Sequence, residues 1–307
     1  TDLPAIHNLN LSNVGPLLPT DGGTIRHLAF VDLTYVSDTN ADFGLFEKGG
    51  NTSNFQDISV ADVVLSSIDI QTQATWVGAL VGRSTKLMFL DGVRASGVTV
   101  SSTTQNAVGI LVGEQHNLSM SDVFIDANSS AIGDGTTSQV GGVAGYTVTV
   151  TASDVTVAAD VAGAKVAGDS GALIAKVATR GTFERIRVTS EASVEGAGTS
   201  IGGILGFLEE GSVRNSYSRA MVESGNSELG GLIGKADTWA SFTDVYFAGT
   251  ISPTTAQAGA IVQEAIDTTV TYTDAVWDAE ESGITVSATG SIDSNTTISG
   301  TTVSMTT

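Results

Sequence analysis

A glycine motif that recurs about every thirty residues is the feature that most constrains how this chain can fold. The motif has the form Gly-x-apolar-x-Gly, and its leading glycines lie 28 to 34 residues apart. A period of that length is typical of proteins that stack one supersecondary unit on the next. Among the later repeats, the closing glycine is replaced by Ala175 and by Gln263, and we expect a different corner at both places. The leading glycines are Gly44, Gly78, Gly109, Gly141, Gly171, Gly202, Gly230 and Gly259.

A second segment follows each glycine motif by about a dozen residues and carries three aligned columns. Two apolar columns lie three residues apart, with a mainly polar column between them. Because a regular strand would place two such positions on opposite faces, the odd spacing predicts a bulge or bend at the polar position. The first apolar column is Phe55, Leu90, Met120, Ala152, Phe183, Val213, Phe242 and Tyr272. The polar column is Asp57, Gly92, Asp122, Asp154, Arg185, Asn215, Asp244 and Asp274. The second apolar column is Ile58, Val93, Val123, Val155, Ile186, Ser216, Val245 and Ala275.

Short apolar runs bounded by Gly, Asn, Asp, Ser or Thr are typical of strands and turns. One unit is too short to bury its own apolar face, but units stacked at about 4.8 Å share one continuous core. We therefore predict an all-β fold, a right-handed parallel β-helix (β-solenoid) of about nine coils. Residues 1–42 are predicted to form the opening coils and residues 43–283 the glycine repeats of this single domain. Residues 284–307 are predicted to be a β-prone tail that pairs with a neighbouring subunit.

Two of the repeats carry a family resemblance. Residues 202–206 read Gly-Gly-Ile-Leu-Gly and are followed by Gly-Ser-Val-Arg-Asn-Ser-Tyr-Ser at 211–218. Residues 230–234 read Gly-Gly-Leu-Ile-Gly, with Phe-Thr-Asp-Val-Tyr at 242–246. These segments resemble the GLUG repeat of bacterial secreted and surface proteins, and the resemblance extends over roughly residues 5–280. It implies a β-solenoid of the adhesin-like kind, used as a structural or binding module.

Charge and composition exclude several classes of function. The 33 acidic and 13 basic residues give a net charge of −20, which opposes binding to nucleic acid or to an anionic membrane surface. Cysteine is absent, which excludes a disulfide scaffold and a thiolate metal site. No apolar run approaches the roughly 20 residues of a membrane helix. The chain begins at Thr1, which indicates an exported mature chain, and we predict a secreted protein at the cell surface.

The segment Gly-Asp-Ser-Gly at 168–171 matches the nucleophile signature of serine proteases. Acyl transfer by serine needs a histidine base, and the chain offers only His7, His27 and His116. Ser170 itself falls in register with the glycine repeat, which favours a structural role. We therefore predict no catalytic residue and a protein that is not an enzyme.

A calcium site is one interpretation of the turn that precedes the first glycine motif. Asp38, Asn40 and Asp42 place oxygen-bearing side chains at alternate positions, as a calcium loop does. However, Phe43 stands where an EF-hand loop has glycine, and Gly49 stands where it has its bidentate glutamate. A polar turn is the favoured interpretation, and a calcium ion that stabilises the coils is the alternative. No other cofactor is predicted.

Arg187, Tyr217 and Tyr246 align in one column of neighbouring coils. Aromatic faces and guanidinium planes stack on one another and on the apolar faces of sugars, so the column predicts a strip for a glycan or a partner. Cross-strand pairing that only stabilises the sheet is the alternative. The aspartates of the polar column could line a cation-binding or carbohydrate-binding strip, but short polar residues at these positions more often satisfy the backbone of a turn.

The favoured function is a non-enzymatic, extracellular structural or adhesive module that assembles end to end into a fibre. Its predicted partners are further copies of the chain or neighbouring repeats of one surface assembly, together with a glycan or cell-surface ligand. Nucleic acid and membrane insertion are not expected. The alternative function is a polysaccharide lyase or hydrolase on a β-helix scaffold, which would need a deep groove with two carboxylates beside Arg185 or Tyr217.

Overall fold

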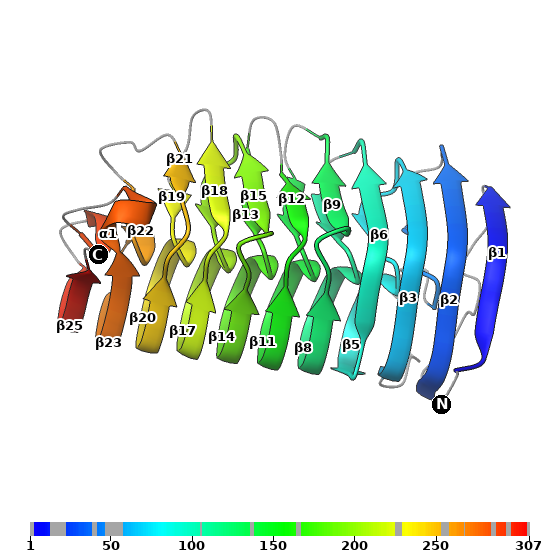
Figure 1. Cartoon of the computed structure of the whole chain (residues 1–307), viewed down its shortest axis with the longest axis horizontal. Coiled ribbons are helices and arrows are strands. Elements are labelled where there is room, and N and C mark those ends of the chain that lie inside the picture. Colours follow the sequence, from blue (N-terminus) through cyan, green and yellow to red (C-terminus); the bar gives the residue numbers. More distant parts are fainter. Residues whose placement is uncertain are drawn as a thin grey trace.

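Parallel strand pairing runs through the whole structure and gives the molecule its elongated shape (Figure 1). The chain is a β-solenoid of about eight turns, with part-turns at its ends, consistent with the predicted count near nine. The described part of this computed structural model is residues 3–12, 23–38, 42–46, 58–104, 106–135, 138–163, 167–224, 229–252, 258–266, 268–283, 287–292 and 296–305.

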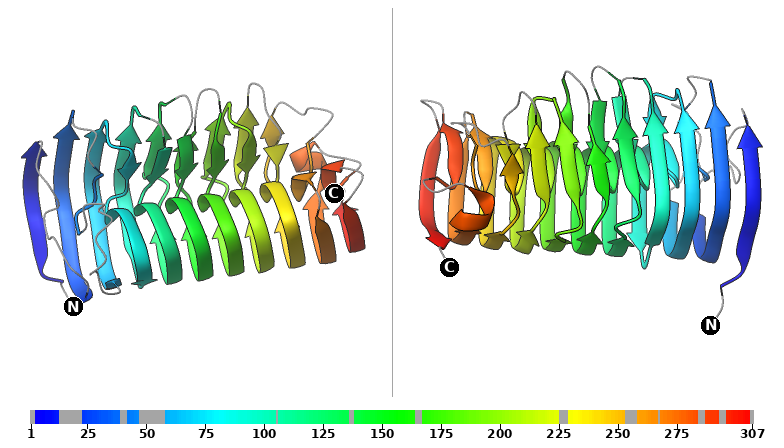
Figure 2. Two further views of the ribbon diagram at one scale, coloured as in Figure 1. Left: turned by 180° about the vertical axis from the view of Figure 1, so that it is seen from behind. Right: turned by 45° about the horizontal axis from the view of Figure 1, so that its top comes forward.

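Two parallel sheets form the walls of the solenoid, and Figure 2 shows both from two further sides. The larger sheet has 19 strands and the smaller has six. The larger comprises β1 (Ala5–Ser12), β2 (Gly23–Ser37), β3 (Ile58–Thr72), β5 (Val81–Asp91), β6 (Arg94–Ser102), β8 (Val112–Ile125), β9 (Ser130–Gly133), β11 (Ala144–Val157), β12 (Asp160–Ala162), β14 (Ile174–Val188), β15 (Ser193–Gly196), β17 (Leu205–Ser218), β18 (Met221–Ser224), β20 (Ile233–Phe247), β21 (Ile251–Ser252), β22 (Val262–Ala265), β23 (Thr269–Asp278), β24 (Thr289–Ile292) and β25 (Thr297–Met305). The smaller comprises β4 (Trp76–Val77), β7 (Asn106–Gly109), β10 (Ser138–Gly141), β13 (Asp169–Gly171), β16 (Ser200–Gly202) and β19 (Leu229–Gly230).

The glycine column predicted from the sequence is confirmed by the strand register. Gly141 of β10 pairs with Gly109 on one side and with Gly171 on the other. The column continues through Gly202 to Gly230 in the same register. Each repeat is therefore one turn of the solenoid, and equivalent residues lie one strand spacing apart.

Glycine is required in this column because the backbones of two turns approach too closely for a side chain. A Cβ atom on Gly202 would lie 2.1 Å from the carbonyl oxygen of Leu205 and 2.6 Å from the backbone nitrogen of Gly234. Both neighbours are main-chain atoms of paired strands, so they cannot move aside cheaply. The repeat motif thus encodes a tight corner between the smaller and the larger sheet.

The different corners that we expected at Ala175 and Gln263 do not appear in the pairing register. Ile174 still pairs with Leu205, and Val262 still pairs with Ile233. Ala175 and Gln263 are completely buried. The side-chain amide of Gln263 has no hydrogen-bond partner among the described residues.

The bend predicted at the polar column is confirmed by the backbone. Six of these residues have φ between 48° and 54°, in the left-handed region that L residues rarely adopt. Aspartate and asparagine tolerate this conformation best among residues with a side chain, which explains the composition of the column. The single left-handed residue reverses the alternation of the strand, so the apolar residues on both sides of it point into the core. The six are Asp122, Asp154, Arg185, Asn215, Asp244 and Asp274.

The alignment of the second turn was wrong by five residues. Val60 pairs with Leu90, and Val64 pairs with Arg94, so the polar-column residue of this turn is Asp62, which is left-handed at φ 50°. Phe55 and Asp57, which we had placed in these columns, lie outside the described residues. Ile58 pairs with Met88 and therefore belongs to an earlier position of the strand than predicted.

The core is one continuous apolar interior from turn to turn. The first apolar column is buried from Leu90 to Tyr272, and rings stack where aromatic residues meet, as between Phe242 and Tyr272 at a centroid distance of 5.4 Å. Ser216 is the only polar member of the second apolar column, and its hydroxyl is satisfied: it donates to the carbonyl of Arg214 at 2.7 Å and accepts from the Ile186 amide at 3.0 Å. Ser216 is therefore buried with both of its hydrogen bonds satisfied by main-chain groups.

The C-terminal tail joins the same stack. A four-residue helix, α1 (Ala279–Ser282), follows β23, because Asp278 caps the amides of residues 280 and 281 and Gly283 ends the helix at φ 73°. β24 then pairs with β22, and β25 pairs with β23. The sequence analysis did not predict α1, because four residues are too few to show a helical period.

Replacing Gly202 by alanine should destabilise the solenoid by about 2–4 kcal/mol, because the new Cβ would overlap main-chain atoms of two turns. The measurement is the free energy of unfolding in urea. Ser212→Ala in β17, at an outward position, serves as the control and should change it by less than about 0.5 kcal/mol. Equal stability of the glycine and alanine proteins would contradict the close approach.

The turn at Asp126, which follows β8, should lose stability in acid. Its carboxylate accepts hydrogen bonds from the Ser96 hydroxyl at 2.6 Å, the Gly97 amide at 3.1 Å and the Ser129 hydroxyl at 2.9 Å. Burial raises the pKa of Asp126, but these hydrogen bonds together outweigh it and the pKa is lowered. A lowered pKa stabilises the fold above the unfolded-state value of about 3.9, and this stabilisation is lost as the pH falls through the folded-state value. Asp126→Asn should therefore lower the free energy of unfolding by about 1 kcal/mol at neutral pH, and the difference should shrink below about pH 4 in urea titrations.

Candidate functional site

An outward-facing column of large side chains runs along the larger sheet. The strand register pairs Arg187 with Tyr217 and Tyr217 with Tyr246, so the column predicted from the sequence is confirmed as a spatial one. It extends towards the N-terminus through residues that the sequence analysis missed. We call the whole set the outer ladder: Arg94, Phe124, Thr156, Arg187, Tyr217 and Tyr246.

The outer ladder lies two residues after the left-handed residue of the polar column in each turn, and for Arg94 that residue is Gly92, at φ 62°. Its residues alternate with buried ones, such as Val155 and Val157 on either side of Thr156. Side chains of successive turns therefore stand side by side at about the strand spacing of 4.8 Å. Phe124 is 41% exposed, so part of its ring faces the solvent.

A shallow hollow of about 410 Å³ opens in the outer ladder. Its position follows from side-chain size, because the small Thr156 stands between the bulky Phe124 and Arg187 of the adjacent turns. The left-handed residues Asp122 and Asp154 lie along one side. The full lining is Arg94, Ser121, Asp122, Val123, Phe124, Asp154, Thr156 and Arg187.

Two arginines hold the aspartates of the hollow. Arg94 donates from Nη2 to both carboxylate oxygens of Asp122 at 2.7 Å. Arg185 donates from Nε and Nη2 to the two oxygens of Asp154, each at 2.7 Å, which is the bidentate geometry that guanidinium and carboxylate favour. Each pair joins adjacent turns.

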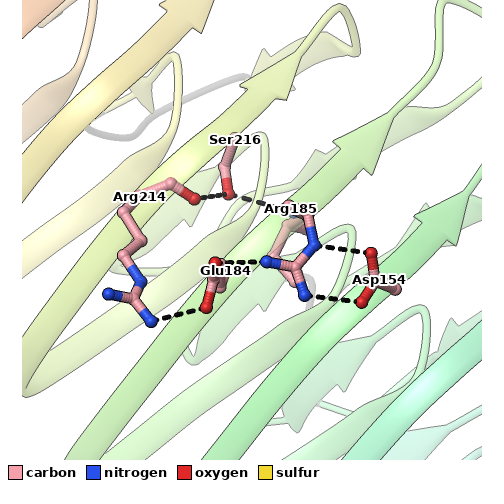
Figure 3. A network of polar contacts seen from close by, with 6 residues as sticks. Asp154, Glu184, Arg185, Arg214 and Ser216 are labelled. Atoms are coloured by element: carbon pink, nitrogen blue, oxygen red, sulfur yellow. Dashed lines mark hydrogen bonds and ion pairs between the residues drawn. The ribbon is translucent and has the colours of Figure 1, made fainter.

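The second of these pairs belongs to a longer network, drawn in Figure 3. Arg185 also contacts Glu184, whose other oxygen accepts from Arg214 at 2.5 Å. The buried Ser216 hydroxyl donates to the carbonyl of Arg214 and so joins the network to the core. The network crosses three turns (Figure 3) and holds Asp154, which lines the hollow.

The charge state of the hollow follows from these contacts. The hydrogen bond from Arg185, with the charges of Arg185 and Arg187, lowers the pKa of Asp154, so its carboxylate is ionised at neutral pH. Arg187 itself differs from its neighbours, because among the described residues no hydrogen bond or ion pair to it is found. The hollow thus contains two aspartates that are each paired with an arginine, and one guanidinium without a direct partner in the described structure.

The serine of the protease-like segment lies in the wall of the core. Ser170 is 1% exposed and takes the position of Val140 and Ile201 in the neighbouring turns. Two histidines have other partners: His27 lies 3.3 Å from Asp62, and His116 lies 3.3 Å from Glu114. The structural role assigned to Ser170 from the repeat register agrees with this position.

Asp169, beside it, is the one buried carboxyl group of β13. It accepts from Thr199 at 3.4 Å, and burial raises its pKa, against the opposing charge of Lys176. It is not among the residues that line the hollow.

The residues predicted as a calcium site and the aspartates of the polar column remain to be placed in the structure. Asn40 of the calcium hypothesis lies outside the described residues, and Asp38 and Asp42 stand on either side of that gap. Within the described ranges, no group of three or more histidine and acidic side chains could hold a metal ion. The described aspartates of the polar column are the left-handed residues of the bend. Among them, only Asp122 and Asp154 line the hollow.

The fold and its repeat define the class of the protein as a parallel β-solenoid. Within it, residues 225–252 match the family described as the GLUG motif, in agreement with the resemblance seen in the sequence. The described part of this match is β20 with β19 before it and β21 after it. Comparison with curated proteins and with solved structures gives no match. In the part of the chain that the structure describes, no helix is long and apolar enough to cross a membrane.

Ser216→Ala should destabilise the protein by about 1–3 kcal/mol, although it makes the second apolar column more apolar, because the buried Ile186 amide loses an acceptor. The free energy of unfolding measures this, and Ser216→Thr, which keeps the hydroxyl, is the matched variant. A gain in stability on removal of the hydroxyl would show that the hydrogen bonds contribute less than the apolar surface.

Proposed function

We propose that the protein is an extracellular structural or adhesive module that acts through the outer surface of its solenoid. The observation that carries this proposal is the uninterrupted register of the turns. Because every turn repeats the same backbone, equivalent outward residues form straight columns along the rod, and a long partner can contact many turns at once. The GLUG motif at 225–252 is consistent with such a module.

The carboxylates of the hollow support binding more than acid catalysis. A polysaccharide hydrolase needs a carboxylic acid that is protonated near neutral pH. Asp122 and Asp154 are instead each engaged by an arginine, and the pKa of Asp154 is lowered. We therefore infer a non-enzymatic role and expect no cleavage when the protein is incubated with acidic or neutral polysaccharides. Release of reducing or unsaturated ends that depends on Asp154 would favour the lyase or hydrolase alternative.

The last strand supports assembly along the axis. All nine residues of β25 are exposed, and none of them is charged, although the chain carries a net charge of −20. Soluble proteins commonly protect open strand edges with charges or proline. A strand from a further repeat of the same polypeptide or from a second copy would meet this edge, and we propose that one of them does.

Sedimentation velocity over a concentration series tests the assembly. The unmodified chain should associate into longer rods as its concentration rises, and the double variant Ile298→Lys/Val303→Lys should stay monomeric, because lysines on both halves of β25 oppose edge pairing. Lys substitution of Met221, an exposed residue of β18 away from the end, is the control and should associate as the unmodified chain does. A chain that is monomeric at every concentration would contradict assembly between copies.

A further inference from the structure

We propose that the hollow between Phe124 and Arg187 binds a uronic acid residue of an extended polysaccharide that lies along the outer ladder. This inference deepens the adhesive function proposed above and rests on it. It names the ligand class and the residues that recognise it.

The size and origin of the hollow favour a sugar ring. Its volume of about 410 Å³ lies in the range of roughly 300–1,000 Å³ that is usual for small-molecule sites. Thr156 is the only small side chain between Phe124 and Arg187 in the outer ladder, so the hollow is a gap one turn wide with a large side chain on each side. A ligand that fills the gap would contact both of these side chains.

The charges of the hollow favour a carboxylate on that ring. Arg94 and Arg185 are each held by an aspartate at 2.7 Å, whereas Arg187 has only the more distant field of Asp154. Its guanidinium is exposed at the wall of the hollow, and its planar donor fork fits a carboxylate. The carboxylate of a uronic acid would supply the partner that Arg187 lacks in the described structure.

The remaining lining fits the rest of the sugar. Phe124 presents an exposed ring, on which the apolar face of a pyranose can stack. The carboxylate groups of Asp122 and Asp154 have oxygen lone pairs that can accept hydrogen bonds from sugar hydroxyls. Tyr217 and Tyr246 continue the ladder beyond Arg187, half-buried, so further sugar residues of the same chain would find aromatic side chains at successive turns.

An acidic peptide fits the hollow less well than a polysaccharide. A run of aspartate or glutamate brings carboxylates but no hydroxyl donors for Asp122 and Asp154. A sugar chain pairs each carboxylate with several hydroxyl groups, which matches a site with one unpaired guanidinium and two carboxylate acceptors.

Isothermal titration calorimetry with short oligomers tests the proposal. The probes are oligogalacturonate, oligomannuronate and oligoglucuronate, with a neutral galactose oligomer and an oligoglutamate of equal length as comparisons. At least one uronate should bind, and at least about tenfold more tightly than both comparisons, as expected for one charge-assisted hydrogen-bonded pair.

Three variants locate the site. Arg187→Gln should weaken uronate binding at least about tenfold. Arg26→Gln removes the same charge from an exposed position on β2, several turns away, and should leave the affinity within about twofold, since exposed charges at that distance are screened. Thr156→Phe fills the gap with a residue that suits a strand, and it should abolish binding without loss of fold, checked by circular dichroism.

The proposal is overturned if none of the three uronates binds, if oligoglutamate binds as tightly, or if Arg187→Gln and Arg26→Gln lose affinity equally. Scattering and sedimentation on the same samples report the rod and its assembly independently of any sugar. A failure to bind uronates by a protein that forms rods would thus refute this ligand while leaving the structural function in place.

Discussion

The approach of main chain to main chain at the glycine corner is the contact on which the rest of the structure depends. At Gly202 a single added carbon would meet a carbonyl at 2.1 Å, so the corner closes only where side chains are absent. The closed corner fixes the path of each turn and therefore the register of the next one. With the register fixed, hydrogen bonds run in parallel ladders through both sheets, and apolar residues of all turns meet in one interior.

The left-handed residue in each turn is the second constraint, and it connects the core to the outer surface. It lets two apolar residues three positions apart both face inward, and it places a short polar side chain at the surface beside the outer ladder. Arg185 is the exception in this column, because it is a long side chain in the left-handed conformation. Its position lets the guanidinium reach back to Asp154 of the preceding turn, and the ion-pair network of Figure 3 follows from it. The rim of the hollow is therefore a consequence of the same bend that builds the core.

Much of the fold could be predicted from the sequence, because the same pattern of glycine, apolar and polar positions recurs in every repeat. The glycine column and both apolar columns are confirmed from Leu90 onward, and the ladder from Arg187 to Tyr246 follows from them. The alignment of the second turn was wrong because Phe55, Asp57 and Ile58 have the same apolar–polar–apolar spacing as Val60, Asp62 and Val63, which occupy the columns in the structure.

The hollow was missed for another reason. It is created by a small residue, and one threonine in a threonine-rich sequence does not stand out. Only the register, which places Thr156 between Phe124 and Arg187, makes its size matter. Phe124 and Arg94 could have been found by extending the aligned column two and three turns from Arg187 towards the N-terminus.

The gap at Thr156 also bears on how such a surface can evolve. Each turn contributes one side chain to the outer ladder, and each turn contacts mainly the turns next to it. Duplication, loss or exchange of whole turns by recombination would preserve the glycine corners and the interior, yet it would reorder the large and small residues outside. New recesses could thus arise, move or vanish through genetic rearrangement alone, with no substitution in the core.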